Sequence, residues 1–439
     1  MFLAKTKSIC DVCSKVVPAQ VFEQKGKILI KKKCSEHGEF VGEHVWDDPE
    51  IYQGISKIKT IPEKSAQLSV ALTYKCNLNC PTCYANANEE KIEDYQWKDL
   101  NKTSDYPVVF LTGGEPTIRK DLPKIIRCLS QKRKKVILFS NGIRLANKKY
   151  LSILKKAGLR YIILQFDSTK DKDNLNIRGR NLFEIKKKVI EYANELELPL
   201  MLYAVIVKNN IDQEIENILN FARSYNNIKG IGLNPLWKIG RYKEEGFLPS
   251  SEIIQKVCDT INIQKSDWVE STRFLCNLDR LFSLFRKKRR LFGKCMLKII
   301  ILPNKNEYIP LSKIFNLKKI SDKIENLYSK KSTVSLIIFF FYFIFSQVFV
   351  NYARNRNFRI LVLHLARNLS YVAKGNFLLF SPFRIISLAI FPIKRNIDFN
   401  FLKECNFNAI SPDDFSFQPA CLHRIKMAEK NKNGKQKQE

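Results

Sequence analysis

The sequence lacks a cleavable signal at its start, because residues 1–6 are followed at once by a cysteine pair and polar residues. It is also short of acidic side chains, with 43 Asp and Glu against 75 Lys and Arg and a formal charge of +32. No recognised nucleic-acid-binding module accompanies this charge, so a specific nucleic-acid partner is not expected. A cytoplasmic, reducing setting without disulfides is expected instead.

Cysteine is present in a number that calls for explanation: the chain has 12 cysteines. Where disulfides are not expected, metal binding accounts for cysteines best. Three of them, Cys76, Cys80 and Cys83, form a C-x3-C-x2-C run. Three thiolates can hold three irons of a [4Fe–4S] cluster, and the fourth iron is then left open for a small molecule. A zinc knuckle is the alternative interpretation of the three-cysteine run alone.

The surroundings of this run favour a parallel α/β fold. Residues 68–74 are apolar and rich in β-favouring side chains, so the cysteines lie on a loop at the C-terminal end of a predicted strand. A second buried strand, residues 108–112, runs into Gly113-Gly114-Glu115-Pro116, where two glycines let the backbone approach a ligand closely. Functional loops of βα barrels lie at these strand ends.

Strands and helices then alternate, which predicts six βα units over about residues 66–240. The further predicted strands are residues 136–139, 161–166, 200–207 and 230–234, and the predicted helices are residues 121–132, 148–157, 182–196 and 213–225.

The two motifs together resemble the radical SAM superfamily. The resemblance implies a partial (βα)6 TIM-like barrel, a [4Fe–4S] cluster held by the three cysteines, and S-adenosylmethionine on the open iron, cleaved reductively to a 5′-deoxyadenosyl radical. It also implies a low-potential electron donor of the ferredoxin or flavodoxin type. The implied cofactor-binding residues are the cluster cysteines with Tyr84, Gly113, Gly114, Glu115, Pro116, Ser140, Asn141, Gln165, Asp167 and Arg178.

Several of these assignments have a plainer alternative. The resemblance implies that Ser140-Asn141-Gly142 lies near the ribose of S-adenosylmethionine. The same sequence is also typical of a βα turn. Gln165 and Asp167 flank a strand end and face either the cofactor or the substrate. Arg178 is a candidate carboxylate clamp or an exposed, solvated arginine.

The first 62 residues contain a second metal motif. Cys10 and Cys13 are followed twenty residues later by Cys34 and His37, a spacing like that of a zinc ribbon. A hairpin with strands at 20–22 and 28–30 joins the two pairs. Zinc or a mononuclear iron fits such a site, and another cysteine is the alternative to His37.

The remaining cysteines are scattered over the C-terminal part. Cys276, Cys295, Cys405 and Cys421 match the ligands of one auxiliary [4Fe–4S] cluster, as in the SPASM and twitch extensions of radical SAM enzymes. Buried free thiols are the alternative. Cys128 and Cys258 fall inside predicted helices and are interpreted as packing residues.

The start of the chain together with the cysteine run resembles, more narrowly, the radical SAM group that includes tetraether lipid synthase. Residues 334–350 are the most apolar stretch, at the lower limit of length for a membrane span. With the positive charge, they favour a peripheral enzyme on the cytoplasmic membrane face that binds anionic lipid and acts on a lipid chain. A buried core helix is the alternative.

These observations predict four regions. They are a metal-knuckle module (1–62), the radical SAM barrel (63–245), an α-rich cluster-binding region (246–425) with an apolar, membrane- or lipid-facing insert (332–395), and a disordered basic tail (426–439). The expected activity is hydrogen abstraction from an aliphatic, lipid-like substrate. Methylation of a small molecule such as a pterin and modification of a peptide are the alternatives, and a binding module without catalysis is the alternative class.

Overall fold

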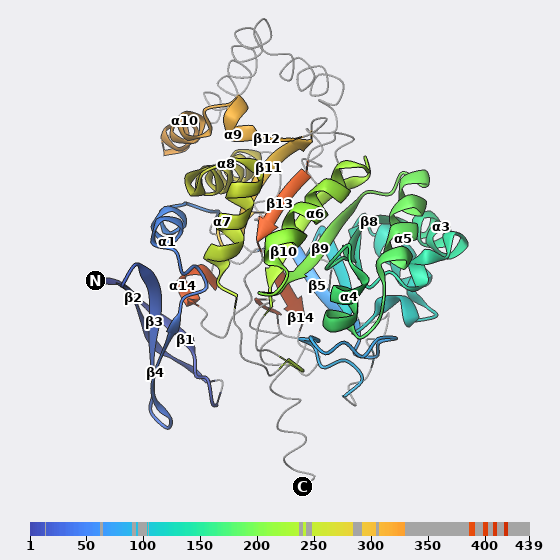
Figure 1. Cartoon of the computed structure of the whole chain (residues 1–439), viewed down its shortest axis with the longest axis horizontal. Coiled ribbons are helices and arrows are strands. Elements are labelled where there is room, and N and C mark those ends of the chain that lie inside the picture. Colours follow the sequence, from blue (N-terminus) through green and yellow to red (C-terminus); the bar gives the residue numbers. More distant parts are fainter. Residues whose placement is uncertain are drawn as a thin grey trace, which may run out of the picture.

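The computed structural model contains two β-sheets with helices packed around the larger one (Figure 1). It describes residues 1–13, 15–61, 65–89, 94, 103, 105–236, 240–242, 248–283, 292–303, 307–329, 386–390, 398–402, 407–410 and 417–419.

The larger sheet is built on six consecutive parallel strands. They are β5 (Gln67–Thr73), β6 (Val108–Gly113), β7 (Lys135–Ser140), β8 (Leu159–Gln165), β9 (Leu200–Ile206) and β10 (Ile228–Pro235). Each pairs in parallel with the next along the chain. This arrangement confirms the predicted partial barrel, with strand bounds that differ by one or two residues from those expected.

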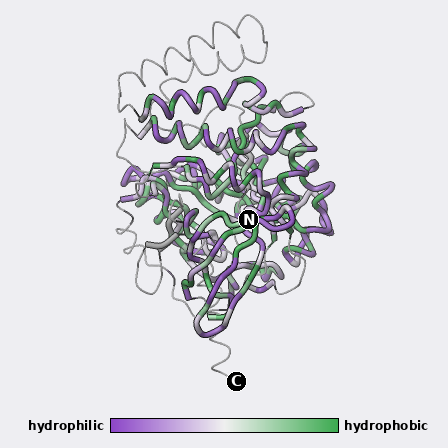
Figure 2. Tube along the Cα trace, turned by 90° about the vertical axis from the view of Figure 1, so that its left-hand side faces the viewer, coloured by the Kyte–Doolittle hydropathy of each residue, from purple (hydrophilic) through white to green (hydrophobic). Residues whose placement is uncertain are grey.

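Five helices connect the strands in this region. They are α2 (Leu122–Gln131), α3 (Lys148–Ala157), α4 (Asp171–Arg178), α5 (Phe183–Glu195) and α6 (Ile211–Arg223), with short 3-10 turns η2 (Pro116–Ile118) and η3 (Arg144–Ala146). In α3 the Asn147 side chain accepts a hydrogen bond from the Tyr150 N–H, and Gly158 ends the helix in the left-handed conformation at φ 110°. Hydrophilic and hydrophobic residues alternate along the outer helices in Figure 2, as expected of helices with one packed face. Helix α4 is a difference from the prediction, which placed a loop around Arg178.

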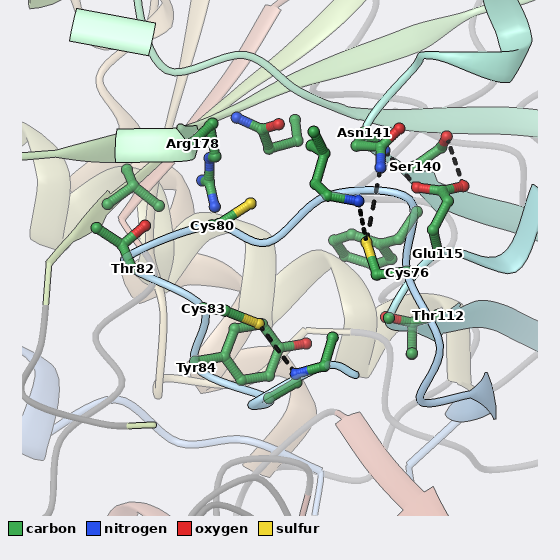
Figure 3. A pocket seen from close by; sticks show the side chains of 18 of the residues that line it. Cys76, Cys80, Thr82, Cys83, Tyr84, Thr112, Glu115, Ser140, Asn141 and Arg178 are labelled. Carbon is green, nitrogen blue, oxygen red and sulfur yellow. Dashed lines mark hydrogen bonds between the residues drawn. The ribbon is translucent and has the colours of Figure 1, made fainter. Parts of the chain in front are cut away.

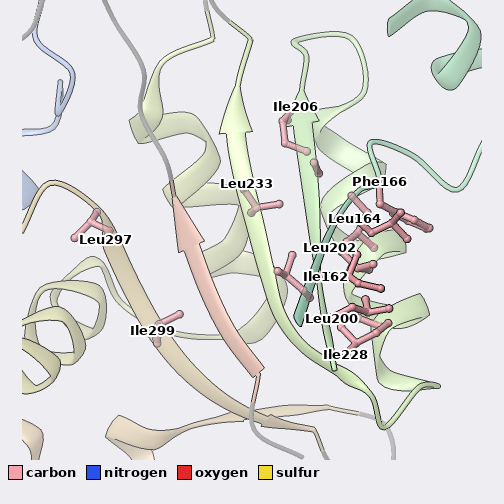
Figure 4. Packing of buried hydrophobic residues seen from close by; sticks show 14 of the residues in the cluster. Ile162, Leu164, Phe166, Leu200, Leu202, Ile206, Ile228, Leu233, Leu297 and Ile299 are labelled. Carbon is pink, nitrogen blue, oxygen red and sulfur yellow. The ribbon is translucent and has the colours of Figure 1, made fainter. Parts of the chain in front are cut away.

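Both faces of the parallel strands are covered. Their sequences are therefore nearly continuous runs of apolar residues. On the outer face, side chains such as Ile162, Leu164 and Leu202 are fully buried against the helices (Figure 4). On the inner face, Phe110, Ile137, Tyr161 and Met201 form a separate cluster. The inner cluster closes the floor of the barrel, so the open space lies toward the C-terminal strand ends.

The smaller sheet is N-terminal and has four antiparallel strands, two more than the expected hairpin. They are β1 (Phe2–Ile9), β2 (Val16–Gln24), β3 (Lys27–Cys34) and β4 (Gly38–Glu43). Val21, Ile28 and Ile30 of this sheet are fully buried and belong to the same core cluster as the barrel. The following helix α1 (Pro49–Ser56) begins at Asp48, whose carboxylate accepts a hydrogen bond from the Ile51 N–H. The module is thus packed onto the barrel at one end.

The C-terminal part that the structure describes contains more helix than strand, as expected, but it also contributes strands that were not predicted. Its helices are α7 (Ser250–Ile261), α8 (Lys265–Ser283), α9 (Leu311–Ile314), α10 (Leu317–Ser329) and α14 (Phe399–Leu402), and its strands are β11 (Leu297–Pro303), β12 (Tyr308–Pro310), β13 (Ile386–Ile390), β14 (Phe407–Ile410) and β15 (Phe417–Pro419). These strands join the large sheet. Strand β13 pairs in parallel with β10 at one edge, and β14 pairs in parallel with β5 at the other.

The position of β13 also corrects the expected insert at 332–395. Residues 386–390 form a strand between β10 and β11, and Ala389 is 1% exposed, so this segment is part of the sheet and does not face lipid. The apolar stretch 334–350 lies outside the described residues. Within the described part of the chain, no helix is long and apolar enough to cross a membrane.

Candidate functional site

A cavity of about 170 Å³ opens at the C-terminal ends of the parallel strands (Figure 3). All three cysteines of the C-x3-C-x2-C run line it, on the loop that leaves β5. Of the other predicted cofactor-binding residues, those that also line it are Tyr84, Gly113, Gly114, Glu115, Ser140, Asn141, Gln165 and Arg178. The structure therefore brings most of the predicted site together.

The cysteine loop is shaped to present sulfur atoms to a metal. Cys76 Sγ accepts a hydrogen bond from the Leu78 N–H at 3.4 Å, and Cys83 Sγ accepts one from the Ala87 N–H at 3.4 Å. Burial raises the pKa of the Cys76 thiol to about 12, so its thiolate form depends on metal coordination. Three sulfurs around one cavity, two of them with N–H donors, fit an iron–sulfur cluster.

The Gly113-Gly114 turn packs against the base of this loop. The Gly114 N–H donates to the Thr73 carbonyl at 2.7 Å, and the Glu115 N–H donates to the Lys75 carbonyl at 2.9 Å. A Cβ atom would lie 2.1 Å from Thr73 O at Gly113, where φ is +135°, and 2.3 Å from Lys75 O at Gly114. Both glycines are therefore required by the close approach of two backbone segments, in addition to any approach to a ligand.

The Glu115 carboxylate accepts four hydrogen bonds from the protein. Its Oε1 accepts hydrogen bonds from the Thr117 N–H, the Thr117 hydroxyl and the Ser140 hydroxyl, and its Oε2 accepts one from the Asn141 N–H at 2.7 Å. Burial raises the pKa of Glu115, although these hydrogen bonds favour the charged form. Glu115 therefore ties the ends of β6 and β7 together, and Pro116 begins the 3-10 turn that follows.

The Ser140-Asn141-Gly142 sequence forms the βα turn that was one of its two interpretations. The Ser140 hydroxyl accepts a hydrogen bond from the Gly142 N–H, and Asn141 Oδ1 accepts one from the Ile143 N–H. Asn141 Nδ2 donates to Asn77 Oδ1 at 2.8 Å and lies 3.9 Å from Cys76 Sγ. The turn thus also contacts the cysteine loop.

Two amide side chains in the cavity have polar atoms without partners among the described residues. Both Nε2 and Oε1 of Gln165 are buried and make no hydrogen bond, and the same is true of Asn234 Oδ1. Phe139 and Tyr203 also line the cavity, with ring centroids 6.0 Å apart in an edge-to-face arrangement. Apolar ring surface and unpaired amides are the features that a flat polar ligand would use.

Asp167 and Arg178 differ from their predicted roles. The guanidinium makes two hydrogen bonds to the Asp167 carboxylate, Nε to Oδ2 at 2.8 Å and Nη2 to Oδ1 at 2.7 Å. Asp167 is fully buried and also accepts the Val205 N–H. Burial is the largest single effect and opposes ionisation, but the charge and hydrogen bonds of Arg178, the charge of Lys186 and the Val205 N–H together outweigh it and lower the pKa of Asp167. Arg178 therefore clamps a carboxylate of its own chain, and Asp167 lies behind the cavity because that pairing holds it there.

Arg241 is a residue of the site that the sequence prediction missed. Its Nη1 donates to the Cys80 carbonyl at 2.7 Å, its Nη2 to the Ala87 carbonyl at 2.6 Å, and its Nε to Glu89. Gly240, at φ +70°, allows this, since a Cβ there would lie 2.3 Å from the Cys83 carbonyl oxygen. The signal in the sequence was a Gly-Arg pair shortly after the last barrel strand.

A separate metal site lies at the far end of the N-terminal sheet. The ligand atoms of Cys10, Cys13, Cys34 and His37 all lie within 4.8 Å of one another. Cys13 Sγ is 3.9 Å from Cys34 Sγ, and His37 Nδ1 is 3.5 Å from Cys34 Sγ and 3.9 Å from Cys10 Sγ. Tetrahedral zinc with three thiolates and one imidazole requires about 3.8 Å between sulfurs and about 3.6 Å between sulfur and nitrogen. The four residues fit one ion.

The C-terminal cysteines are described only in part. Cys276 is buried on α8, and Cys295 precedes β11. Both lie near Lys298, whose pKa is lowered by burial, and their charges oppose that shift. Cys405 and Cys421 lie outside the described residues, so the auxiliary cluster stays a prediction. Cys128 and Cys258 lie on helices α2 and α7, as expected.

Comparison with known families agrees with this geometry. Residues 70–222 match the radical SAM superfamily, and residues 2–46 match the HMPTM N-terminal zinc ribbon domain. Residues 70–222 are therefore similar to radical SAM proteins, and residues 2–46 are similar to a zinc ribbon. The matches give no support for the narrower resemblance to the tetraether lipid synthase group.

Among individual proteins, the chain is 35% identical over 280 residues to the 7,8-dihydro-6-hydroxymethylpterin dimethyltransferase of Methanocaldococcus jannaschii, covering 56% of this chain and 55% of the relative. It is 29% identical over 210 residues to a GTP 3',8-cyclase of Clostridium botulinum, covering 45% and 65%. Among solved structures, Streptococcus suis SuiB bound to S-adenosylmethionine matches with 22% identity and a TM-score of 0.41, covering 45% of this chain and 48% of SuiB. The chain spans less than two thirds of each of these proteins.

We expect Arg241→Ala to weaken retention of the cluster, because each charge-assisted hydrogen bond that it loses contributes about 1.5–3 kcal/mol. Arg241→Lys should restore retention only in part, since an ammonium lacks the planar fork that reaches two carbonyls. Iron content and the rate at which cluster absorbance decays under chelator are the measurements. The exposed Arg180→Ala is the control, and equal decay of all variants would contradict the role given to Arg241.

For the zinc ribbon, we expect Cys34→Ser to release one metal ion per chain and to loosen only the metal end of the N-terminal sheet, because Val21, Ile28 and Ile30 hold the other end on the barrel core. Hydrogen exchange should rise at residues 10–13 and 34–38. Cys128→Ser is the control. Unchanged metal content in Cys34→Ser would show that the four residues do not form the site.

Proposed function

We propose that this chain uses radical SAM chemistry to modify a fused nitrogen heterocycle, with methylation of a pterin as the favoured reaction. The observation that carries this proposal is the pair of unpaired amide side chains, Gln165 and Asn234, beside Phe139 and Tyr203 in the cavity. This was the alternative that the sequence left open beside an aliphatic lipid substrate.

The amide of Gln165 matches the chemistry of such a ring. A pterin carries a ring N–H, an exocyclic amino group and a carbonyl along one edge. A carboxamide offers one acceptor and two donors in one plane, so it can pair with two neighbouring groups of that edge. An unpaired buried polar group costs about 1–3 kcal/mol, and a ligand that pairs with it recovers this energy.

The names of two similar proteins support a ligand with this hydrogen-bonding edge. The methanogen relative is named for a dihydropterin and the cyclase for GTP. Guanine and pterin share the 2-amino-4-oxopyrimidine ring, so one amide can recognise either. The higher identity and the matching zinc ribbon favour the pterin over the nucleotide for this chain.

A lipid chain is the weaker candidate substrate. An alkyl chain would leave both amide atoms of Gln165 unpaired in an apolar environment, which is unfavourable. The apolar stretch 334–350 that favoured a membrane surface lies outside the described residues, and residues 386–390 of the same expected insert form a strand of the sheet. Binding to anionic membranes therefore has no support from the described site.

Within this proposal, Cys76, Cys80 and Cys83 hold the cluster, and backbone groups of the 113–116 turn bind S-adenosylmethionine. When bound, these cofactors supply a radical that takes hydrogen from an unactivated carbon. The Glu115 carboxylate binds Thr117, Ser140 and Asn141 and also lines the cavity, so it can position the turn beside the cofactor. Its role is to position the turn. Arg241 holds the cysteine loop in place, and the apolar walls exclude water.

Two further elements stay proposals. We propose a ferredoxin or flavodoxin as the electron donor, because the cluster needs a low-potential electron. We also propose that Cys276 and Cys295 belong to an auxiliary cluster, supported by their common proximity to Lys298.

The direct test is turnover under anaerobic conditions with reductant and S-adenosylmethionine. The full chain, with reconstituted cluster, is incubated in parallel with 7,8-dihydro-6-hydroxymethylpterin, GTP and a phospholipid dispersion. We expect mass spectrometry to detect one or more added methyl groups on the pterin alone. Modification of the lipid, or of GTP without the pterin, would contradict the proposal.

We expect Gln165→Leu to weaken binding of the dihydropterin at least about tenfold, equivalent to about 1.4 kcal/mol, while S-adenosylmethionine binds as before. Equilibrium dialysis of each ligand against the reconstituted protein measures both affinities. The control is Gln213→Leu, which makes the same replacement at an exposed position on α6. Loss of S-adenosylmethionine binding with pterin binding retained would assign Gln165 to the cofactor instead.

A further inference from the structure

A completely buried lysine lies beside Asp167. Lys186 is on α5, and its side chain has no exposed surface. Its Nζ makes no hydrogen bond to any described residue and lies 3.8 Å from Asp167 Oδ2. Burying an ammonium without a hydrogen-bond acceptor costs several kcal/mol, whereas a methionine of similar length would pack there favourably. The position therefore calls for a reason other than packing.

Asp167 does not require Lys186 to balance its charge. Arg178 already pairs with this carboxylate through two hydrogen bonds. The three buried groups are the cations of Lys186 and Arg178 and the carboxylate of Asp167. Because Lys186 adds a second cation, the group as a whole has a net charge of +1. Burial lowers the pKa of Lys186, and the Asp167 carboxylate 3.8 Å away opposes this shift and favours the ammonium.

The excess charge lies behind one ligand of the iron–sulfur cluster. Arg178 points toward Cys80 in Figure 3, and both residues line the cavity together with Cys76 and Cys83. The Lys186 Nζ lies 3.8 Å from the Asp167 carboxylate that Arg178 also binds. Cys80 is 9% exposed, so water screens these interactions little.

We propose that Lys186, acting through the Asp167–Arg178 pair, raises the reduction potential of the cluster bound at Cys76, Cys80 and Cys83. Reduction adds one electron from an external low-potential donor, and no bond forms or breaks in this step. The added negative charge is stabilised by a fixed positive charge held nearby in a medium of low dielectric constant. Lys186 is not a ligand of the cluster and does not contact the substrate. Its proposed effect on the cluster is electrostatic.

The test is an anaerobic potentiometric titration of the full, reconstituted chain, followed by the electron paramagnetic resonance signal of the reduced cluster. Lys186→Met removes the charge and keeps the length of the side chain. We expect its midpoint potential to fall by at least 59 mV, which is a tenfold change in the equilibrium constant for one electron. Lys188→Met removes the same charge from an exposed position on α5 and should leave the potential unchanged.

An unchanged potential in Lys186→Met with wild-type iron content would overturn the proposal. If that variant does not hold the cluster, Lys186→Gln is titrated in its place. If neither neutral variant retains iron and the wild-type melting temperature, Lys186 is a structural residue and the proposal is wrong. The titration uses neither pterin nor turnover, so its result is independent of the proposed substrate.

Discussion

The site depends on one contact between two backbone segments. Gly113 and Gly114 lie so close to the carbonyls of Thr73 and Lys75 that no side chain fits between them. This contact joins the base of the cysteine loop to the end of the neighbouring strand. From there Glu115 reaches the turn after β7, and Asn141 in that turn reaches back to Asn77 on the cysteine loop. The ends of three adjacent strands are thereby fixed to one another.

Other contacts hold the same loop from two further directions. Arg241, which follows β10, binds carbonyls of Cys80 and Ala87, and the Thr82 hydroxyl donates to the Ile177 carbonyl on α4. A loop without regular secondary structure is thus attached to both sides of the barrel. Such attachment gives a fixed geometry to sulfur ligands whose positions the loop alone would not determine.

The sequence was sufficient for features with local causes. Apolar runs gave the six parallel strands, and motif spacing gave the cysteine loop and the glycine turn. It was insufficient where partners are distant in the chain. Arg178 and Asp167 were assigned to a ligand because nothing local shows that they pair with each other across eleven positions. The strand at 386–390 was interpreted as part of a lipid-facing insert, because an apolar segment looks the same whether sheet or lipid covers it.

Lys186 is a case in which the sequence held a signal that was not used. Residues 186, 189, 190 and 193 lie on one face of α5, and all four are buried. Three of them are apolar, so the helical period alone places the lysine among core residues. A charged residue on the apolar face of an amphipathic helix is thus a sign that its interior neighbours require a charge.

The pairing of the sheet edges has a consequence for synthesis of the chain. The edge at β10 is covered by β13 and the edge at β5 by β14, both from residues 386–410. At about 5–20 residues per second, β10 leaves the ribosome roughly 10–30 seconds before β13. Throughout that time the nascent barrel has two unpaired, apolar strand edges, which are sites of aggregation. The partly synthesised chain is therefore more prone to aggregation than the completed one, in which both edges are paired.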